Sequence, residues 1–279
     1  MKYLIFGNGY IGQKFKEHFK NSAMSGIRVK CENDVLSEIK KHKPNWVLNC
    51  AGITGRPNID WCEDNKEATF EGNVILPLTI AKACQKAGVR MMHLGSGCVY
   101  SGDNNGHGWS EDDAPNFSGS FYSKTKALSE DMLKDYNVLQ LRLRMPIDND
   151  ISSERNFIKK ITNYKKVIDT KNSMTIIDDL LRIAEVLMKK DKTGIYNVVN
   201  PGPMSHSEIL NLYKKYIDPN FKYTVMTNKE LYKKYAKAER SSCVLDNSKL
   251  MKKIKLKTLR ERITEILNNS RKAIEAVEP

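Results

Sequence analysis

A glycine-rich turn near the start of the chain limits the fold more than any other sequence feature. Gly7, Gly9 and Gly12 form a G-x-G-x-x-G pattern directly after an apolar stretch at residues 2–6. An amphipathic helix is predicted over residues 11–19, because its apolar side chains recur at helical spacing. A strand, a glycine turn and a helix in this order let a pyrophosphate approach the N–H groups at the positive end of the helix. The alternative is an ordinary tight turn.

Alternating strands and helices predict the fold class of the first half. Strands are expected at residues 2–6, 27–29, 46–52, 89–96 and 138–143, and helices at residues 11–19, 64–87 (with a break near Pro77) and 122–136. Strands separated by helices of this length pair in parallel with right-handed crossovers. The expected fold class is therefore α/β, with a doubly wound parallel (Rossmann) sheet.

The pattern changes after Pro146. Helices are expected at residues 157–164, 177–189, 208–217, 229–236 and 259–267, with a short apolar strand at 195–199 and a helix-capping box at 205–208. We therefore expect a dinucleotide-binding domain at residues 1–147. A smaller, mainly substrate-binding α/β region is expected at residues 148–279, and whether it threads back into the first domain is left open.

Composition excludes several classes of protein. With 279 residues, 40% hydrophobic and 28% charged, the chain is neither disordered nor a membrane bundle. No run approaches the ~20 apolar residues of a membrane span, so no membrane partner is expected. The six cysteines are widely spaced and never form C-x-x-C, which argues against a zinc knuckle or a disulfide scaffold. We expect a cytoplasmic protein, since its start resembles no leader peptide.

The net charge of +13 lies almost entirely in the second half. Residues 151–279 hold 27 Lys and Arg against 15 Asp and Glu. One interpretation is a lysine-rich solvated surface, and the other is a field that attracts an anionic ligand. No nucleic-acid partner is expected, because no basic run is interleaved with aromatic residues as single-strand binding requires. His206 has no second ligand at a suitable spacing, so no metal is expected.

Tyr122 and Lys126 form the sharpest motif in the chain. At i and i+4 they share one face of a predicted helix. A nearby ammonium favours the phenolate, which lowers the pKa of a tyrosine toward that of a proton donor to a reduced carbonyl. Ser96 ends a predicted strand, where it could bind the carbonyl oxygen, and Cys98 lies two residues further. The alternatives are an exposed tyrosine stacked on a lysine stem and a buried inert cysteine.

These motifs resemble those of an extended short-chain dehydrogenase/reductase. More narrowly, residues 49–63, 115–126, 141–147 and 156–160 resemble the bifunctional nucleotide-rhamnose synthase/epimerase-reductases, which convert UDP-4-keto-6-deoxyglucose to UDP-L-rhamnose. Two departures stand out. The glycine turn is one residue shorter than the G-x-x-G-x-x-G common in that group, and the loop at 101–114 is shorter than expected, so substrate contacts there stay unassigned.

The resemblance implies two chemistries in one pocket. Cys98 is expected to act as base and Lys160 as acid in epimerisation at C3 and C5 of a 4-keto sugar. Hydride from NADPH then reduces C4, while Tyr122 protonates the oxygen with help from Lys126 and Ser96. Cations at 28 and 30 precede the acid at 32, so NADPH is expected and NADH is possible. The expected cofactor-binding residues are Gly7, Gly9, Tyr10, Ile11, Gly12, Asn49, Ala51, Gly52, Tyr122 and Lys126.

The substrate nucleotide needs its own contacts. Arg240 is the expected pyrophosphate anchor, since a guanidinium binds phosphate oxygens in pairs, and Arg56, Asn116 and Asn156 are expected along the sugar. For each of them a structural hydrogen bond is the alternative. The sequence does not separate UDP from dTDP. A homodimer is possible, and an upstream 4,6-dehydratase is the expected pathway partner.

Two other functions compete with this interpretation. The first is a monofunctional reductase of the dTDP-4-keto-rhamnose type, against which Cys98 and Lys160 argue. The second is a non-catalytic regulator that binds NADP, which would need the glycine turn but neither Ser96, Tyr122 nor Lys126.

Overall fold

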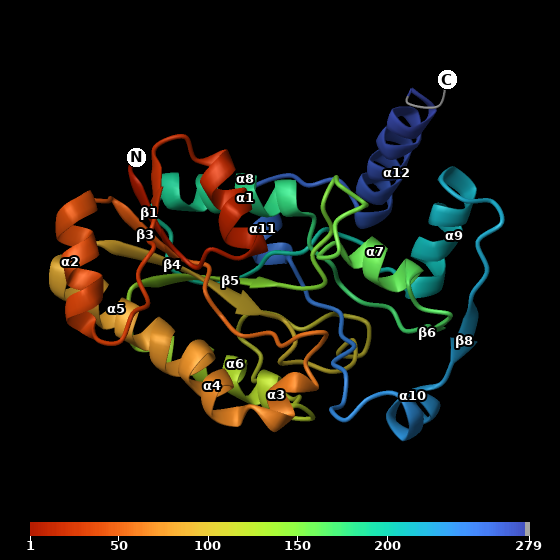
Figure 1. Cartoon of the computed structure of the whole chain (residues 1–279), viewed down its shortest axis with the longest axis horizontal. Coiled ribbons are helices and arrows are strands. Elements are labelled where there is room, and N and C mark those ends of the chain that lie inside the picture. The colour runs from red at the N-terminus through yellow and green to blue at the C-terminus, as the bar shows by residue number, and fades with distance from the viewer. Residues whose placement is uncertain (277–279) are drawn as a thin grey trace.

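A six-stranded parallel sheet forms the centre of the computed structural model, which describes residues 1–276 (Figure 1). Adjacent strands are parallel throughout, in the order β2-β1-β3-β4-β5-β7. The strands are β1 (Tyr3–Phe6), β2 (Ser22–Met24), β3 (Trp46–Asn49), β4 (Arg90–Ser96), β5 (Val138–Leu143) and β7 (Gly194–Asn197). The doubly wound α/β fold class predicted from the sequence is therefore confirmed.

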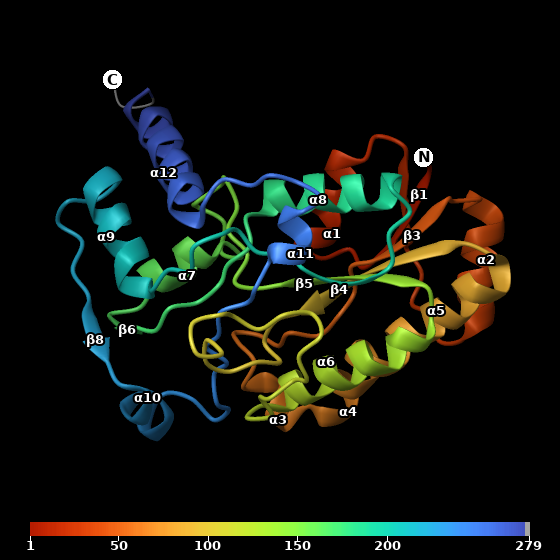
Figure 2. The same ribbon diagram turned by 180° about the vertical axis from the view of Figure 1, so that it is seen from behind.

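Helices cover both faces of this sheet (Figures 1 and 2). Alternate residues of β1 enter different cores: Tyr3 and Ile5 belong to one apolar cluster, and Leu4 and Phe6 to another. Because both faces are buried, the strand is a continuous apolar run rather than an alternating one. The first cluster includes side chains of α1 (Tyr10–His18) and α8 (Ile177–Lys189), and the second those of α2 (Glu32–His42) and α5 (Leu76–Ala87).

The strand order reverses between β1 and β3. From β1 the chain crosses to β2 on one side, and then returns to form β3 on the other side. In an open α/β sheet, ligands bind outside the carboxyl ends of the strands at such a reversal. The glycine turn that follows β1 lies at this point.

Two local predictions are wrong. Residues 27–29 form no strand: the chain pairs with β1 earlier, at Ser22–Met24, and Ile27 is exposed beyond the sheet edge. The helix expected at 64–87 does not break at Pro77: the backbone is helical at Ile75 and Leu76, just before Pro77 in the first turn of α5. The irregularity is instead a π-helical turn at Glu71–Ile75, between α4 (Lys66–Phe70) and α5.

Other elements match their predictions or were missed. The predicted strands at 89–96 and 138–143 match β4 and β5 to within about one residue. The predicted helix at 177–189 matches α8. The predicted helix at 122–136 matches α6 (Phe121–Met132), which a 3-10 turn continues at Leu133–Asp135. The capping box at 205–208 is present at the start of α9 (His206–Tyr216). The elements missed are α2, α3 (Trp61–Asp64), the strands β6 (Lys166–Ile168) and β8 (Thr224–Met226), and α11 (Ser248–Met251).

The chain beyond residue 147 divides between two places. The strands β6 and β8 form a small parallel sheet, and α7 (Phe157–Thr162), α9 and α12 (Leu259–Glu275) share a separate apolar cluster beside it; α10 (Asn228–Lys234) follows β8. In contrast, α8 packs on the central sheet and β7 pairs with β5. Within residues 1–276, no helix has both the length and the apolar character needed to cross a membrane.

Candidate active site

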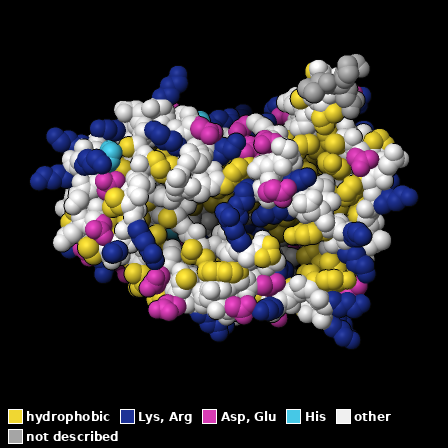
Figure 3. All heavy atoms as spheres, in the orientation of Figure 1, with side chains coloured by type: hydrophobic (Ala, Val, Ile, Leu, Met, Phe, Trp, Pro, Cys, Tyr) yellow, Lys and Arg dark blue, Asp and Glu magenta, His cyan; other side chains and the backbone are white. Residues whose placement is uncertain are grey.

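A cavity of about 420 Å³ opens at the carboxyl ends of the central strands. Its walls come from the glycine turn, the segment after β3, the ends of β4 and β5, and the helices α6 and α7. Figure 3 shows a hollow near the middle of this face, with Lys and Arg side chains gathered beside it. The predicted site residues that line the cavity are Gly9, Tyr10, Ile11, Ala51, Gly52, Ser96, Cys98, Tyr122, Lys126 and Lys160.

The three glycines of the turn serve different purposes. A Cβ on Gly7, whose φ is +103°, would lie 2.3 Å from the backbone N of Ala51, and one on Gly12 would lie 1.9 Å from the Gly7 oxygen. Both are therefore required for close backbone packing. A Cβ on Gly9 would meet no atom within 4 Å. Gly9 is the N-cap residue of α1, so the first N–H groups of this helix have no side-chain cap. This cradle fits a dinucleotide pyrophosphate.

Asn49 supports this cradle from beneath. Its side chain is fully buried, and Oδ1 accepts a hydrogen bond from the Ala51 N–H at 3.1 Å. Asn73 makes a comparable contact with the same backbone segment, because its Oδ1 accepts a hydrogen bond from the Ile53 N–H at 2.8 Å. Asn49 is absent from the cavity lining. It therefore orders the backbone that lines the cavity rather than lining it itself.

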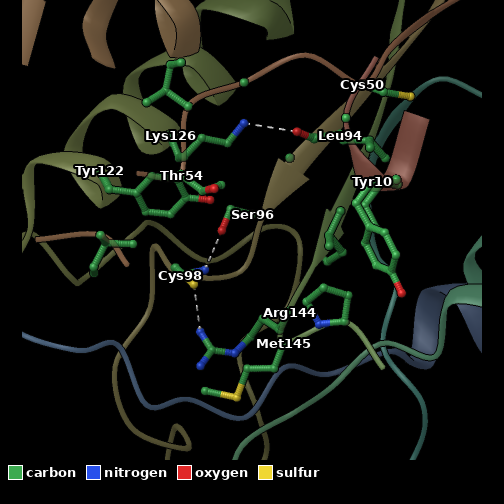
Figure 4. Close-up of a pocket in the computed structure, with 18 of the residues that line it drawn as sticks. Tyr10, Cys50, Thr54, Leu94, Ser96, Cys98, Tyr122, Lys126, Arg144 and Met145 are labelled. Carbon is green, nitrogen blue, oxygen red and sulfur yellow. Dashed lines mark hydrogen bonds between the residues drawn. The ribbon is translucent and has the colours of Figure 1, made fainter. Parts of the chain in front are cut away.

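The Tyr122 hydroxyl and Lys126 ammonium belong to one turn of α6 and enter the same cavity (Figure 4). Burial raises the pKa of Tyr122 well above its ordinary value, and the neighbouring Cys98 adds to this, although a hydrogen bond with Ser96 opposes it. The expected lowering of the Tyr122 pKa by Lys126 is thus not found. The Lys126 ammonium is turned instead toward β4, where it donates to the Leu94 oxygen at 3.0 Å.

Burial also changes the acidity of Lys126 itself. It lowers the pKa of this fully enclosed ammonium to about 8. His93 lies beside it, with Nε2 at 3.4 Å from the Lys126 Nζ, and burial holds the pKa of His93 well below its ordinary value. A neutral imidazole outside the cavity lining therefore lies beside the weakened ammonium of Lys126, which lines the cavity.

Cys98 and Lys160 reach the cavity from opposite halves of the chain. Cys98 follows β4, where its N–H donates to Ser96 Oγ at 3.1 Å. Lys160 lies on α7, and burial lowers its pKa, with Arg155 adding to the effect. Lys159 is not in the lining, so α7 presents Lys160 to the site. A thiol, a weakened ammonium and a phenol thus surround one space, an arrangement that suits proton transfer at carbons beside a carbonyl.

A family model described as the RmlD substrate binding domain matches residues 1–272. The chain belongs to this family. It is 44% identical over 239 residues to the bifunctional dTDP-4-dehydrorhamnose 3,5-epimerase/dTDP-4-dehydrorhamnose reductase of Arabidopsis thaliana, which covers 82% of this chain and 79% of the relative. It is also 44% identical over 242 residues to a trifunctional UDP-glucose 4,6-dehydratase/UDP-4-keto-6-deoxy-D-glucose 3,5-epimerase/UDP-4-keto-L-rhamnose-reductase of the same plant, but spans only 36% of that longer protein.

Solved structures of two other proteins share this fold. The UDP-rhamnose synthase of Acanthamoeba polyphaga mimivirus superposes with a TM-score of 0.91 at 33% identity, covering 96% of this chain and 99% of the other. A dTDP-4-dehydrorhamnose reductase of Bacillus anthracis in complex with NADP superposes with a TM-score of 0.80 at 19% identity, covering 96% and 97%. The second likeness concerns the fold alone.

Four residues predicted to bind substrate in this RmlD-family chain are not part of the cavity lining. Arg240 forms a two-pronged ion pair with Asp60, both contacts at 2.8 Å, and this pair lowers the pKa of Asp60. Asn116 exchanges hydrogen bonds with the Ser101 backbone. Asn156 is fully buried: it caps α7 and donates to two backbone oxygens. Arg56 is exposed on a loop.

The short loop at 101–114 contributes nothing to the lining either. It pairs with the segment that follows residue 241: the Gly102 N–H donates to the Ser242 oxygen and the Trp109 N–H to the Val244 oxygen, both at 2.9 Å. Trp109 also stacks on Tyr100. The loop is therefore held by the segment after residue 241 and by Tyr100, outside the cavity lining.

Several lining residues were not found from the sequence. They are Cys50, Ile53, Thr54, Met145, Arg144, Arg155 and Phe157. Arg144 and Arg155 could have been found from the sequence. Each lies beside the end of a predicted strand or helix, where a basic side chain suits an anionic ligand. His206, by contrast, packs edge-on against Phe157, and burial lowers its pKa to about 4. Among residues 1–276, no cluster of three or more His, Cys, Asp or Glu side chains is placed to hold a metal ion.

Proposed function

We propose that this chain converts a nucleotide-linked 4-keto-6-deoxy-D-glucose to nucleotide-L-rhamnose. It would epimerise C3 and C5 and then reduce the 4-keto group with NADPH. The observation that carries the proposal is that Cys98 and Lys160 line the same cavity as Ser96, Tyr122 and Lys126. A reductase alone has no use for the first two side chains. The names of the plant and viral relatives agree with this assignment.

The cofactor would lie across the glycine cradle. The N–H groups at the start of α1 would bind its pyrophosphate, and Ala51 and Gly52 would flank it. When bound, NADPH supplies the hydride for C4. Arg28 and Lys30, both exposed past the end of β2, favour the 2′-phosphate of NADPH over the free hydroxyl of NADH.

Epimerisation needs a base on one face of the sugar ring and an acid on the other. The Cys98 thiolate would take the proton from C5 or C3, and the C–H electrons would pass into an enolate on the 4-oxygen. Ser96 would hydrogen-bond to that oxygen. The Lys160 ammonium would return a proton to the opposite face, for which its lowered pKa is suited. Both side chains then exchange protons with solvent and are reset.

Reduction would follow in the same place. As C4 accepts hydride, its oxygen gains the Tyr122 proton. The raised pKa of Tyr122 keeps this proton in place until it is needed. Lys126 would hold the cofactor ribose and assist the phenol, and Ser96 would keep the oxygen aligned.

A single reaction tests both chemistries. NADPH absorbance is followed with UDP-4-keto-6-deoxyglucose in deuterated water, and the product is analysed by NMR. We expect NADPH oxidation and deuterium at C3 and C5 of a rhamnose product. Oxidation without deuterium would leave a monofunctional 4-reductase. If the protein binds NADPH tightly but turns over neither the UDP sugar nor the dTDP sugar, the interpretation as a non-catalytic NADP-binding regulator would be correct.

Cys98→Ala is the matched variant for this reaction. It should lose deuterium incorporation and yet still bind NADPH, because the thiol lies apart from the glycine cradle. Exchange at the parental rate in this variant would overturn the epimerase assignment. The substrate itself must come from a 4,6-dehydratase, an activity named in the trifunctional plant relative. The six cysteines are unpaired thiols, which suits the reducing cytoplasm that we propose for this pathway.

We also propose a homodimer. Four large apolar side chains are exposed on contacting elements on one side of the sheet, namely Phe70 of α4, Ile75 of the π-helical turn, and Leu128 and Met132 of α6. A cluster of exposed apolar groups marks an interaction surface. Light scattering after gel filtration should give twice the mass of one chain, and Ile75→Lys with Leu128→Lys should give the monomer. A monomeric parent protein would contradict this proposal.

A further inference from the structure

Arg144 is a buried cation that neither proposed reaction step has used. It follows β5, its side chain is 1% exposed, and it lines the cavity. One of its terminal nitrogens contacts the Gly97 oxygen, Ser241 Oγ and Cys98 Sγ, and the other contacts Asn172 Oδ1 and the Ser241 oxygen. None of these contacts is a carboxylate, and the Arg144 Nε has no partner at all.

The neighbouring Arg142 shows how a buried arginine is usually neutralised, which is by an ion pair with a carboxylate. Arg142 is equally buried, at 1% exposure, but it forms a two-pronged ion pair with the Glu130 carboxylate at 2.6 and 2.7 Å. Its charge is therefore neutralised inside the protein. A guanidinium does not lose its proton in a protein, so the charge on Arg144 persists without such compensation. A buried charge in this position stabilises negative charge on whatever ionisable group lies against it.

Four ionisable groups lie close enough to Arg144 to interact with its charge: Cys98, Cys243, Tyr122 and His206. His206 can carry no negative charge for Arg144 to stabilise, and Arg144 helps to lower its pKa. Cys243 is not a candidate for a thiolate, because its thiol donates a hydrogen bond to the Gly97 oxygen at 3.3 Å and burial raises its pKa. Burial likewise raises the pKa of Tyr122. Cys98 differs from both: it is half-buried, it faces the cavity, and its Sγ lies 3.5 Å from Arg144 Nη1 (Figure 4).

We propose that Arg144 is a positioning residue that pairs with the Cys98 thiolate and stabilises it. The inference rests on the proposed function for the use of that thiolate as the epimerase base. A thiol must lose its proton before it can accept one from carbon, and a free thiol ionises only near pH 8.5. The guanidinium supplies the charge, while Asn172 and Ser241 fix its direction. After each turnover, Cys98 returns its newly gained proton to solvent.

Other charged groups near Cys98 have to be separated from this effect. Lys126 interacts with Cys98 through space, without a hydrogen bond to its sulfur. Tyr122 and Cys243 are neutral at pH 7 and oppose a thiolate only when ionised. Lys126→Met is therefore the matched control, since it removes a buried cation close to the thiol but leaves the Arg144 contact intact.

The test measures Cys98 ionisation directly and needs no substrate. The full-length protein is alkylated with iodoacetamide between pH 5 and 10, and the Cys98 peptide is followed by mass spectrometry. We expect the midpoint of this rate in the parent protein to lie below that of the same cysteine in urea. In Arg144→Met, the rate at pH 7 should fall at least about tenfold, which corresponds to a midpoint raised by one pH unit. Arg144→Lys should recover part of the loss, and Lys126→Met should change the midpoint less than Arg144→Met does.

An unchanged profile in folded Arg144→Met would overturn the proposal. If that variant does not fold, the parent protein decides: a Cys98 midpoint at or above that of the same cysteine in urea overturns the proposal, and a midpoint clearly below it supports it. Deuterium exchange then links the thiolate to function, with an expected loss of about 100-fold in Arg144→Met. Failure of the parent protein to exchange would defeat the proposed function but would leave the alkylation result standing.

Discussion

Tyr122 and Cys98 lie in one cavity but are assigned to different steps, so single substitutions should separate them. Tyr122→Phe removes the proton donor and keeps the ring. We expect NADPH oxidation to fall by about 10²–10⁴-fold, the usual contribution of a general acid, while deuterium exchange at C3 and C5 continues. The two rates are measured by absorbance and by NMR on the same sample. Loss of both rates together would mean that the phenol also serves the epimerase step.

Lys126 gives the reduction step a pH limit. Burial lowers its pKa to about 8, so the ammonium is present below that pH and is lost as the pH rises through it. If the charge supports the Tyr122 phenol and the cofactor, kcat/KM for NADPH oxidation should decline above pH 8. Lys126→Arg should be slower but should lack this decline, because a guanidinium stays charged. A flat parental profile up to pH 9.5 would contradict the assignment.

Residues within one element were easier to place from the sequence than residues that depend on distant partners. Tyr122 and Lys126 follow from helical spacing alone. Arg240 was expected to anchor phosphate, yet it pairs with Asp60, which lies 180 positions away. Asn156 was expected on the sugar, yet its side chain is used by α7 and the preceding loop. Sequence shows which groups can bind an anion or an amide, but long-range pairing decides which of them are already engaged.

The same contrast appears among the elements. β4 and β5 were predicted because both are rich in apolar residues, and both are almost entirely buried in the structure. α2 was missed because it is mostly polar: Val35 and Ile39 are the apolar residues that it buries. The strand β2 is only three residues long and carries no distinctive pattern. Its position is set by pairing with β1 rather than by its own composition.

α7 is a short helix that carries Lys160; Asn156 caps it, and Arg155 lies just before this cap. Asn156→Ala removes the cap and leaves buried backbone groups without partners, which should lower the free energy of unfolding by about 1–3 kcal/mol. It should also reduce deuterium exchange, since Lys160 loses its fixed position. Thr227→Ala is the control, because it uncaps α10 in the same way outside the cavity lining. Urea unfolding and NMR exchange measure the two effects. Equal exchange losses in both variants would argue against a local role for α7.

At the scale of the whole molecule, we predict that the net charge of +13 attracts both proposed anionic ligands. The excess lies in the half of the chain that provides α7 and its cations. Salt screens such a field over about 10 Å at 0.1 M, so kcat/KM for NADPH and for the nucleotide sugar should fall as ionic strength rises, with kcat little changed. Stopped-flow or steady-state kinetics between 0.02 and 0.5 M salt measure this. Salt-independent kcat/KM values would assign the lysines to solvation alone.

The position of β7 also constrains the order in which the protein can form during its own synthesis. A ribosome delivers β5 and then about fifty further residues before Gly194–Asn197 can pair with it. At 5–20 residues per second, the outer edge of β5 stays open for about 3–11 s. An open strand edge invites pairing with other chains. The nascent polypeptide is therefore most vulnerable to aggregation in this interval, when a chaperone would have most to protect.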